Sequence, residues 1–431
     1  MPENVAEKTA HDHPPVRWRA LAPLRVPAYR PLVGSVALSL FAGGMWTVVL
    51  VFQVIALSDS PVALSAVASG LSAGIFLFSL LGGVVADRVS KRAVIIVVHA
   101  ASAVVTSVIT LLAFTGLIQL WHLGLASLAL GASAAFFYPA YTAYLPTILP
   151  ARDLLAANGL EGALRPALQQ AAGPALAGVV VGAFLPRTGA LIVTVLYALA
   201  FVLVLLLPKE PPADASSAGA SGGVKSAFGE LREGVLFTVR TPWLLWTLLF
   251  ACFAVLAVMG PVEVLLPFLA RDAFDDGERV FGLLLTFFGL GAIIGSLAVS
   301  SWRLPRRYLT VMVLGWGLGN VPLVVLGYTD SFWIMAAAVF VVGLTDGAGM
   351  VIWGTLLQRR VPAHMLGRVS SLDFFVSLAL MPASIAAAGP LSQVVPIPLI
   401  FVGAGLLPLA FALIALIAAR MPSDELAHPL T

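Results

Sequence analysis

Residues 83–92 read Gly83-Val84-Val85-Ala86-Asp87-Arg88-Val89-Ser90-Lys91-Arg92 and place four charged side chains within six positions. The cluster stands out because only 10% of the 431 residues are charged, whereas 60% are hydrophobic. An average soluble domain is about 25% charged, and a compact soluble protein with so few charges could not cover its surface. The composition therefore argues against a soluble enzyme or a disordered chain and indicates an integral membrane protein.

The charge cluster separates two long apolar runs, and runs of similar length recur along the chain. A helix needs roughly 20 apolar residues to cross a hydrocarbon core ~30 Å thick. A transmembrane barrel would instead need alternating strands of ~10 residues, and these runs do not alternate. We therefore predict an all-α membrane protein with twelve transmembrane helices, at 31–57, 62–86, 93–115, 120–143, 158–183, 189–207, 243–269, 280–300, 308–328, 332–355, 369–391 and 397–419.

The longest polar interruption divides these helices six and six. It opens with PKEPP at 208–212 and continues with nine small residues at 215–223, a composition typical of a flexible linker. We expect five segments: a cytoplasmic N-terminal tail (1–30), an N-terminal six-helix bundle (31–207), a cytoplasmic linker (208–241), a C-terminal six-helix bundle (242–419) and a cytoplasmic C-terminal tail (420–431).

The distribution of Lys and Arg favours a cytoplasmic N-terminus. With that orientation, 20 of the 24 basic residues lie in cytoplasmic tails and loops, where such residues are enriched. Only Arg187, Arg271 and Arg279 fall in outside loops, and Arg165 lies within the fifth span. An even number of spans then returns the C-terminus to the cytoplasm. The net charge of +3 reflects this topology and does not indicate nucleic-acid binding.

Two landmarks recur in the same order in both halves. The pattern Arg-x-x-Lys/Arg-Arg occurs at 88–92, after the second span, and again 215 positions later at 303–307, after the eighth. The pattern Pro-Ala-x-x-Leu, followed by Leu and an acid, occurs at 150–161 and again 212 positions later at 362–373. Glu161 ends the first copy and Asp373 ends the second. Two related six-helix halves with a binding site between them are a transporter architecture.

The segment 83–92 resembles the signature Gly-x-x-x-Asp-Arg-x-x-Lys/Arg-Lys/Arg of the major facilitator superfamily, which lies between helices two and three. The resemblance covers residues 25–420 and implies two pseudo-symmetric six-helix bundles, in which helices one, four, seven and ten line a central cavity. It also implies a cytoplasmic gate that locks the outward-facing state. The gate candidates are Gly83, Asp87, Arg88, Lys91, Arg92, Glu161 and Asp373; alternatively, the basic residues are only topology anchors.

Other stretches resemble bacterial drug and siderophore exporters, which include macrolide, tetracycline and enterobactin efflux proteins. These stretches are 135–140, 155–158, 173–178 and 361–371. The Gly173-Pro174 segment resembles a shortened form of the antiporter motif of proton-driven exporters. Many of those exporters carry an arginine in helix four, whereas span four here has none. This departure argues against arginine-based proton coupling.

Five ionisable side chains lie within the spans, where burying a charge costs free energy, so each is expected to have a partner or a function. Glu161 and Arg165 are four residues apart and face one another on a helix, as a local ion pair or as part of the gate. Asp373 falls in the first turn of span eleven, where the helix dipole favours a carboxylate. Glu263 in span seven and Asp346 in span ten are expected to face the cavity.

Glu263, Asp346 and Arg165 are the candidates for proton coupling and substrate binding, because intramembrane acids often relay protons. A packing role beside nearby glycines is the alternative for Asp346. An apolar, aromatic cavity with few acids suits bulky amphipathic cations. The candidates for lining it are Phe41, Trp46, Gln53, Tyr138, Tyr141, Gln169, Trp246, Phe250 and Trp353, although packing or lipid contact is the alternative for many of the aromatics.

These features predict a secondary active transporter that exports amphipathic drugs in exchange for protons by alternating access. Export of one endogenous metabolite, such as a siderophore, is the nearer alternative, and a non-transporting receptor or enzyme on this scaffold is the more remote one. We expect a monomer in a bacterial inner membrane. No phosphate-binding loop, metal-ligand spacing or catalytic cluster is visible, so we expect no cofactor or metal, and Cys252 allows no intrachain disulfide.

Overall fold

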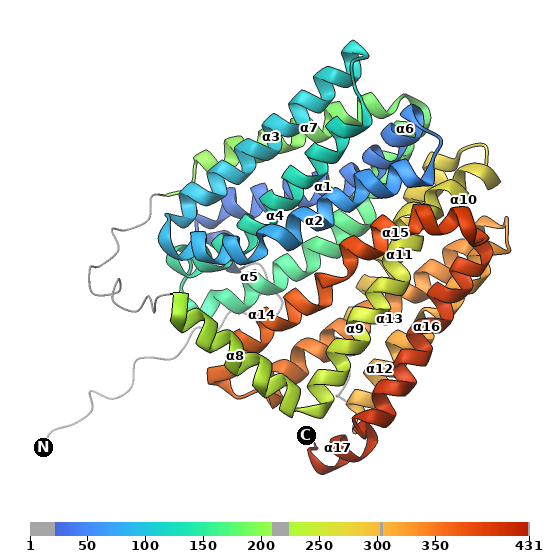
Figure 1. Cartoon of the computed structure of the whole chain (residues 1–431). Coiled ribbons are helices and arrows are strands. Elements are labelled where there is room, and N and C mark those ends of the chain that lie inside the picture. Colours follow the sequence, from blue (N-terminus) through green and yellow to red (C-terminus); the bar gives the residue numbers. More distant parts are fainter. Residues whose placement is uncertain (1–21, 209–223, 302–304, 430–431) are drawn as a thin grey trace, which may run out of the picture.

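The structure is a computed structural model and describes residues 22–208, 224–301 and 305–429. The described residues form helices and no β-strand (Figure 1). The N-terminal half comprises α1 (Tyr29–Leu57), α2 (Pro61–Arg88), α3 (Lys91–Thr115), α4 (Leu120–Ile148), α5 (Ala151–Leu164), the π-helical segment η2 (Arg165–Ala172), α6 (Gly173–Ala183) and α7 (Pro186–Leu205).

The C-terminal half begins with α8 (Val224–Arg240), which lies outside the predicted spans. It continues with α9 (Pro242–Gly260), the π-helical segment η4 (Pro261–Leu265), α10 (Leu266–Ala273), α11 (Gly277–Ser301), α12 (Tyr308–Gly319) and the 3₁₀ segment η5 (Val321–Gly327). The last elements are α13 (Phe332–Arg360), α14 (Ala363–Ala379), α15 (Met381–Val394), α16 (Ile397–Ala418) and α17 (Met421–Ala427).

Eleven helices among the described residues are long and apolar enough to cross a membrane, which confirms the all-α membrane class. The predicted span 158–183 is not among the eleven. There the chain passes through α5, η2 and α6, and four polar residues lower its hydropathy: Glu161, Arg165, Gln169 and Gln170. The count of twelve crossings therefore stays a prediction that depends on this segment.

Prolines explain the two π-helical segments. Pro166 is the second residue of η2, and Pro261 is the first residue of η4. Proline lacks a backbone N–H and its ring clashes with the carbonyl four residues earlier, which favours a local widening of the helix. The two segments carry Arg165, Gln169 and Glu263, so these polar candidates lie on irregular backbone, as functional residues often do.

Equivalent helix pairs are packed in the same way in the two halves, which supports the predicted internal repeat. In the N-terminal half, a Cβ added to Gly131 of α4 would lie 2.0 Å from the carbonyl oxygen of Leu71 in α2. In the C-terminal half, a Cβ added to Gly295 of α11 would lie 1.9 Å from the carbonyl oxygen of Leu344 in α13. Spans two and four thus meet through glycine, and so do spans eight and ten.

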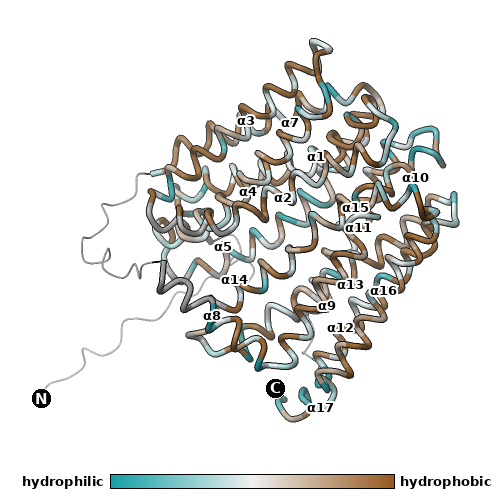
Figure 2. Tube along the Cα trace, in the orientation of Figure 1, coloured by the Kyte–Doolittle hydropathy of each residue, from teal (hydrophilic) through white to brown (hydrophobic). Residues whose placement is uncertain are grey.

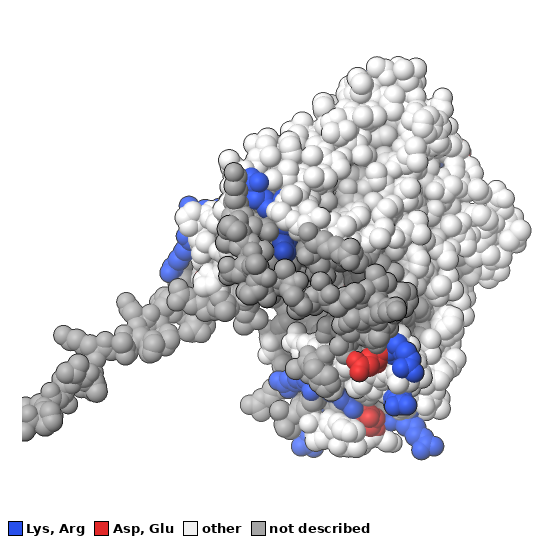
Figure 3. All heavy atoms as spheres, turned by 60° about the vertical axis from the view of Figure 1, so that its left-hand side comes forward, with Lys and Arg blue, Asp and Glu red and all other residues white. Residues whose placement is uncertain are grey.

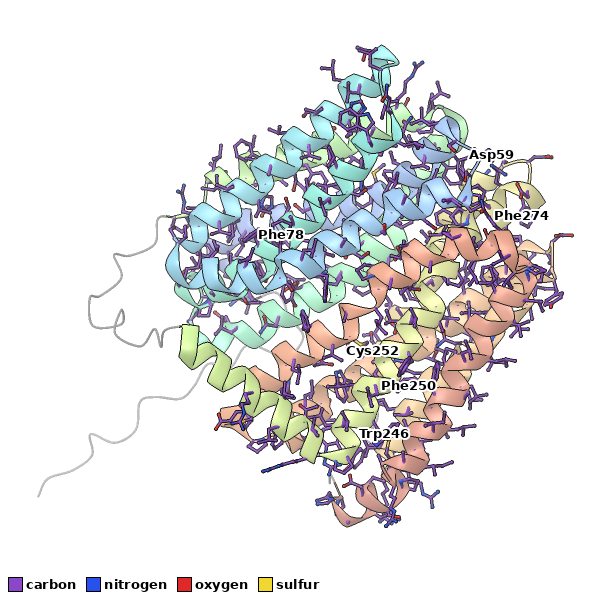
Figure 4. All side chains as sticks on the ribbon, viewed as in Figure 1. Asp59, Phe78, Trp246, Phe250, Cys252 and Phe274 are labelled. Atoms are coloured by element: carbon purple, nitrogen blue, oxygen red, sulfur yellow. The ribbon has the colours of Figure 1, made fainter. Side chains whose placement is uncertain are left out.

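The two halves meet along two helix pairs, α2 with α15 and α6 with α11. The Ser65 hydroxyl of α2 accepts a hydrogen bond from the Gly389 N–H of α15 at 2.7 Å. A Cβ added to Gly282 of α11 would lie 2.5 Å from the Pro174 carbonyl oxygen of α6. The halves converge toward the end labelled Asp59 in Figure 4, the Asp59 end. They diverge toward the opposite end, where α8 and α17 lie (Figure 1). We call this second end the Arg92 end, because α3 starts there at Lys91–Arg92.

Two short helices occupy segments that we expected to be a linker and a tail. The second part of the predicted linker 208–241 forms the helix α8, which packs on α9 and α14. Residues 209–223 lie outside the described chain. In the predicted tail, α17 packs on α12 and α16. The Glu425 carboxylate of α17 is fully buried and accepts hydrogen bonds from Leu309 N, Thr310 N and the Thr310 hydroxyl, at 2.6–3.1 Å. It therefore caps the start of α12.

The surface chemistry matches a protein embedded in lipid. Hydrophobic residues follow the helices, and polar residues gather mainly at the ends (Figure 2). Figure 3 shows the Arg92 end, where Lys and Arg side chains gather in both halves. Exposed arginines at this end include Arg30, Arg240, Arg306, Arg359 and Arg420. The charge asymmetry predicted from the sequence is thus present in the folded protein.

Candidate functional site

A polar cluster surrounds Arg165 in the N-terminal half. Its guanidinium forms an ion pair with Glu161 at 3.1 Å, which confirms that the two side chains face one another. It also approaches the Gln169 side-chain oxygen at 3.4 Å and lies over the Tyr138 ring, 5.5 Å from the centroid. The Arg165 side chain is 40% exposed and that of Glu161 is 12% exposed, so this cluster is partly accessible.

Buried aromatic side chains pack against the Glu161 side of the cluster. Tyr141 is buried and stacks on Phe137 of the same helix at 5.6 Å. Tyr29 is also buried, and both tyrosines lie near the Glu161 carboxylate. The predicted site residues Tyr138, Arg165 and Gln169 thus come together, whereas Tyr141 belongs to the packing beneath them.

The predicted lining residues of α1 lie in tightly packed surroundings. A Cβ added to Gly44 would lie 2.4 Å from the Gln169 carbonyl oxygen, so α1 touches η2 directly. Phe41 is partly buried against the main hydrophobic core. Trp46 and Gln53 are buried, and the Trp46 Nε1 and Gln53 Oε1 atoms have no hydrogen-bond partner among the described residues.

In the C-terminal half, Trp353 and Asp373 form a direct contact. The Trp353 indole N–H donates a hydrogen bond to Asp373 at 3.0 Å, and the Ser377 hydroxyl donates to the same carboxylate at 3.2 Å. Our placement of Asp373 in the first turn of its helix was wrong, because α14 begins ten residues earlier at Ala363. Two side-chain donors, rather than a helix N-terminus, therefore stabilise this carboxylate.

Glu263 and Asp346 lack such partners. Neither carboxylate forms a hydrogen bond or an ion pair with another residue that the structure describes, and both residues are partly buried. Asp346 shares one face of α13 with Met350 and Trp353, because these residues follow the i, i+4, i+7 spacing of a helix. Met350 is 57% exposed, whereas Trp353 is buried, so this face is accessible at Met350, one turn from the acid.

Trp246 and Phe250 of α9 contact neighbouring apolar helices rather than a polar candidate. Phe250 is buried and stacks on Trp316 of α12 at 6.2 Å between centroids. Together with Phe253 they line an apolar groove of about 200 Å³ between α9 and α16. Figure 4 labels Trp246 and Phe250 along α9. The structure therefore does not bring these two aromatics together with Glu263.

The predicted gate is only partly described. The side chains of Gly83, Asp87 and Arg88 lie outside the described part of the structure, so their role stays a prediction. Lys91 is the first residue of α3, and the Ser90 hydroxyl caps this helix by accepting from Ala93 N at 3.3 Å. Arg92 donates to the Leu207 carbonyl at 2.8 Å and to the Leu205 carbonyl at 3.3 Å. It therefore secures the end of α7.

An ion pair that we did not predict joins the halves at the Asp59 end. Arg271 of α10 binds Asp59, which lies between α1 and α2, and also Asp272 at 2.7 Å. Asp59 and Arg271 are 212 positions apart, so this ion pair joins segments that are distant in the sequence.

Other contacts between the halves lie along the helices, away from the helix ends. The Thr286 hydroxyl of α11 donates to the Ala171 carbonyl of η2 at 3.1 Å. On the other side, Phe76 of α2 stacks on Phe375 of α14 at 5.0 Å between centroids. No pattern within one segment of sequence could have indicated these partners. No group of three or more potential metal ligands occurs among the described residues.

The comparisons with known proteins agree with this architecture. A model of the transmembrane secretion effector family matches residues 18–429. The chain belongs to this family. The uncharacterized MFS-type transporter YkuC of Bacillus subtilis is 30% identical over 313 residues, which cover 69% of this chain and 70% of YkuC. The family assignment makes this chain a transporter of the major facilitator type and confirms the superfamily resemblance.

Other relatives of this chain are named as efflux proteins. The multidrug efflux pump Tap of Mycobacterium tuberculosis is 27% identical and covers 83% of this chain and 85% of its own length. Macrolide efflux protein A of Enterococcus faecalis is 21% identical, with coverages of 70% and 92%. A crystal structure of a mutant of the nucleoside transporter NupG superposes with a TM-score of 0.68 at 13% identity and covers 91% of this chain and 99% of NupG. This likeness shows the shared fold.

Proposed function

We propose that this chain is a proton-coupled exporter of amphipathic drugs that works by alternating access between its two halves. The proposal fits relatives that are named as efflux pumps and the two-half architecture. We further propose that it acts as a monomer in a bacterial inner membrane, without a cofactor and without enzymatic activity. Its N- and C-termini would face the cytoplasm, because exposed arginines gather at the Arg92 end.

The observation that carries the proposal is the contrast among the intramembrane charges. Arg165 is paired with Glu161, and Asp373 accepts two hydrogen bonds. Glu263 and Asp346 have no partner among the described residues. An unpaired carboxylate in a membrane span is costly, and binding a proton or a cation removes that cost. These two acids are therefore the proposed carriers of protons or of a cationic substrate.

The side chains near these charges suit amphipathic substrates. Tyr138 is 45% exposed beside Arg165, and Met350 is 57% exposed beside Asp346. Aromatic faces bind organic cations, and flexible Met side chains adapt to ligands of different shape. The two surfaces come from α4 and α13, which correspond to predicted spans four and ten. We propose that a substrate binds between them.

The proposed transport cycle needs a second arrangement of the halves. In the structure, the described ion pair between the halves lies at the Asp59 end, and the halves diverge at the Arg92 end. With the Arg92 end in the cytoplasm, this arrangement is the inward-facing one. Rupture of the contacts at the Asp59 end would accompany the change to the outward-facing state.

An accumulation assay tests the proposal. We expect a host without its own major pumps to accumulate less ethidium when it expresses this chain, and we expect a protonophore to abolish the difference. Glu263→Gln and Asp346→Asn should impair efflux, because the amide does not carry the proton. Asp276→Asn is the matched control, since Asp276 is exposed in a loop at the Asp59 end. Proton-dependent efflux at wild-type rates in both span variants would remove the two acids from the mechanism.

Export of an anionic metabolite, such as a siderophore, is the second candidate, and the state of Arg165 bears on it. A substrate with carboxylate groups would need a cation that is free to bind it, whereas Arg165 already pairs with Glu161. We expect Glu161→Gln to release Arg165 and to improve the binding of anionic solutes. Export of an anionic iron chelator by the wild type, without export of any cationic dye, would favour this second candidate.

A further inference from the structure

An apolar groove on the outer surface of the C-terminal half has a basic rim at one end. Trp246 and Phe253 of α9 line one wall, and Phe411 and Ile414 of α16 line the other. Phe253 and Ile414 are 42% and 50% exposed. The groove lies within two helices that are long and apolar enough to span the membrane, so the medium outside it is lipid.

Two arginines flank the groove where it approaches the Arg92 end. Arg240 stands two residues before α9 begins, and Arg420 stands two residues after α16 ends. The two helices pack against each other and run in opposite directions, which brings the start of α9 and the end of α16 to the same end. Both arginine side chains are exposed, and neither forms a hydrogen bond or ion pair with another residue that the structure describes.

The nearby acids leave this basic rim uncompensated. Asp424 is engaged by Arg360, and the Glu425 carboxylate is buried against the start of α12. Trp246 lies between the arginines and the deeper Phe253–Phe411 contact, where the ring centroids are 5.0 Å apart. A tryptophan at the boundary between headgroups and acyl chains is typical of membrane proteins.

From these features we propose that the groove between α9 and α16 binds an anionic phospholipid. The acyl chain lies along Trp246, Phe253, Phe411 and Ile414, and the phosphate meets Arg240 and Arg420. Charge selects the lipid, since basic side chains at the membrane surface attract anionic headgroups. A zwitterionic lipid fills the same groove without this electrostatic gain.

Native mass spectrometry of the purified full-length protein tests the assignment. The protein is equilibrated with equal amounts of phosphatidylglycerol and phosphatidylcholine, and the retained lipid is identified. We expect the wild type to retain phosphatidylglycerol preferentially. Arg240→Gln and Arg420→Gln should each reduce the preference about fivefold, the factor that corresponds to ~1 kcal/mol for one basic residue near the membrane surface. Arg359→Gln, an exposed arginine at the same end but not beside the groove, should leave it unchanged.

A second pair of variants tests the groove itself. Ile414→Trp should fill the groove and lower retention of phosphatidylglycerol, while Leu413→Trp should not, because Leu413 is exposed beside the groove but does not line it. Thermal unfolding of each variant shows that it is folded. Equal retention of both lipids by the wild type would overturn the proposal, and so would equal loss of phosphatidylglycerol in the Arg359→Gln or Leu413→Trp controls. Occupancy of the groove by an amphipathic dye in place of lipid would overturn it as well.

Discussion

Reversing the charge of Asp59 should weaken the junction between the two halves at the Asp59 end. Asp59 is the partner of Arg271 across that junction, so Asp59→Arg replaces an attraction with a repulsion. The two halves would then separate more readily at this end, and the population would shift away from the arrangement in the structure. Because Asp59 lies in a loop and Arg271 lies in the last turn of α10, we expect the substitution to leave the packing within each half unchanged.

The expected magnitude follows from exposure. The Asp59 side chain is 75% exposed and that of Arg271 is 29% exposed, so the pair resembles a surface salt bridge worth about 0.2–1 kcal/mol. Asp59→Asn removes only this attraction, and Asp272 still neutralises Arg271. We expect a shift of up to about fivefold in the ratio of the two states. Asp59→Arg adds a repulsion of similar size, so the total change is about 0.4–2 kcal/mol and the shift should be about 2- to 30-fold.

Distance measurements between spin labels on the two halves can detect this shift. Thr115 and Asp275 are exposed in different halves at the Asp59 end, and replacement of Cys252 leaves a background without cysteine. We expect Asp59→Arg to populate longer distances, and the double exchange Asp59→Arg/Arg271→Asp to reverse this in part. Asp276→Arg carries the same charge change outside the pair and serves as the control. Identical distance distributions for Asp59→Arg and the wild type would refute this reasoning.

Three further predictions concern stability and can be checked by thermal unfolding in detergent. Glu425→Ala should cost about 0.5–2 kcal/mol, because it removes the side-chain cap from the start of α12; a lowered melting temperature that recovers with Glu425→Asp would support a capping role. Gly295→Ala should destabilise the protein by about 1–3 kcal/mol through overpacking. Gly354→Ala is the control and should not destabilise it, because nothing lies within 4 Å of the added Cβ. Equal effects of the two substitutions would contradict the packing argument. Trp353→Phe and Asp373→Asn should be coupled by about 0.5–3 kcal/mol in a double-mutant cycle, and strict additivity would show that their hydrogen bond contributes nothing.

Features that depend on local sequence were predictable. The helical membrane class follows from runs of about 20 apolar residues, because lipid offers no partner for an unpaired backbone group. The Glu161–Arg165 pair was also predictable, since positions four apart face one another on a helix. The order of the repeats was visible as well, because related halves keep their landmarks in the same order at similar spacings.

Features that depend on packing were not predictable in the same way. The partner of Asp373 is an indole 20 positions away on another helix, and the partner of Asp59 is an arginine 212 positions away in the other half. Helix periodicity shows which residues share a face, but it does not show which neighbour that face meets. For this reason Trp246 and Phe250 were grouped with the cavity, whereas they face a groove beside α16.

The apolar runs and the charge cluster at 83–92 established the kind of solvent, the class of fold and the family resemblance, because hydropathy and short motifs are properties of the chain. The tertiary structure decided which charges are satisfied. It paired Arg165 with Glu161 and gave Asp373 two donors, and it left Glu263 and Asp346 without a described partner. The physical reason is that the cost of a buried charge depends on the groups around it, and packing brings those groups together from distant parts of the chain.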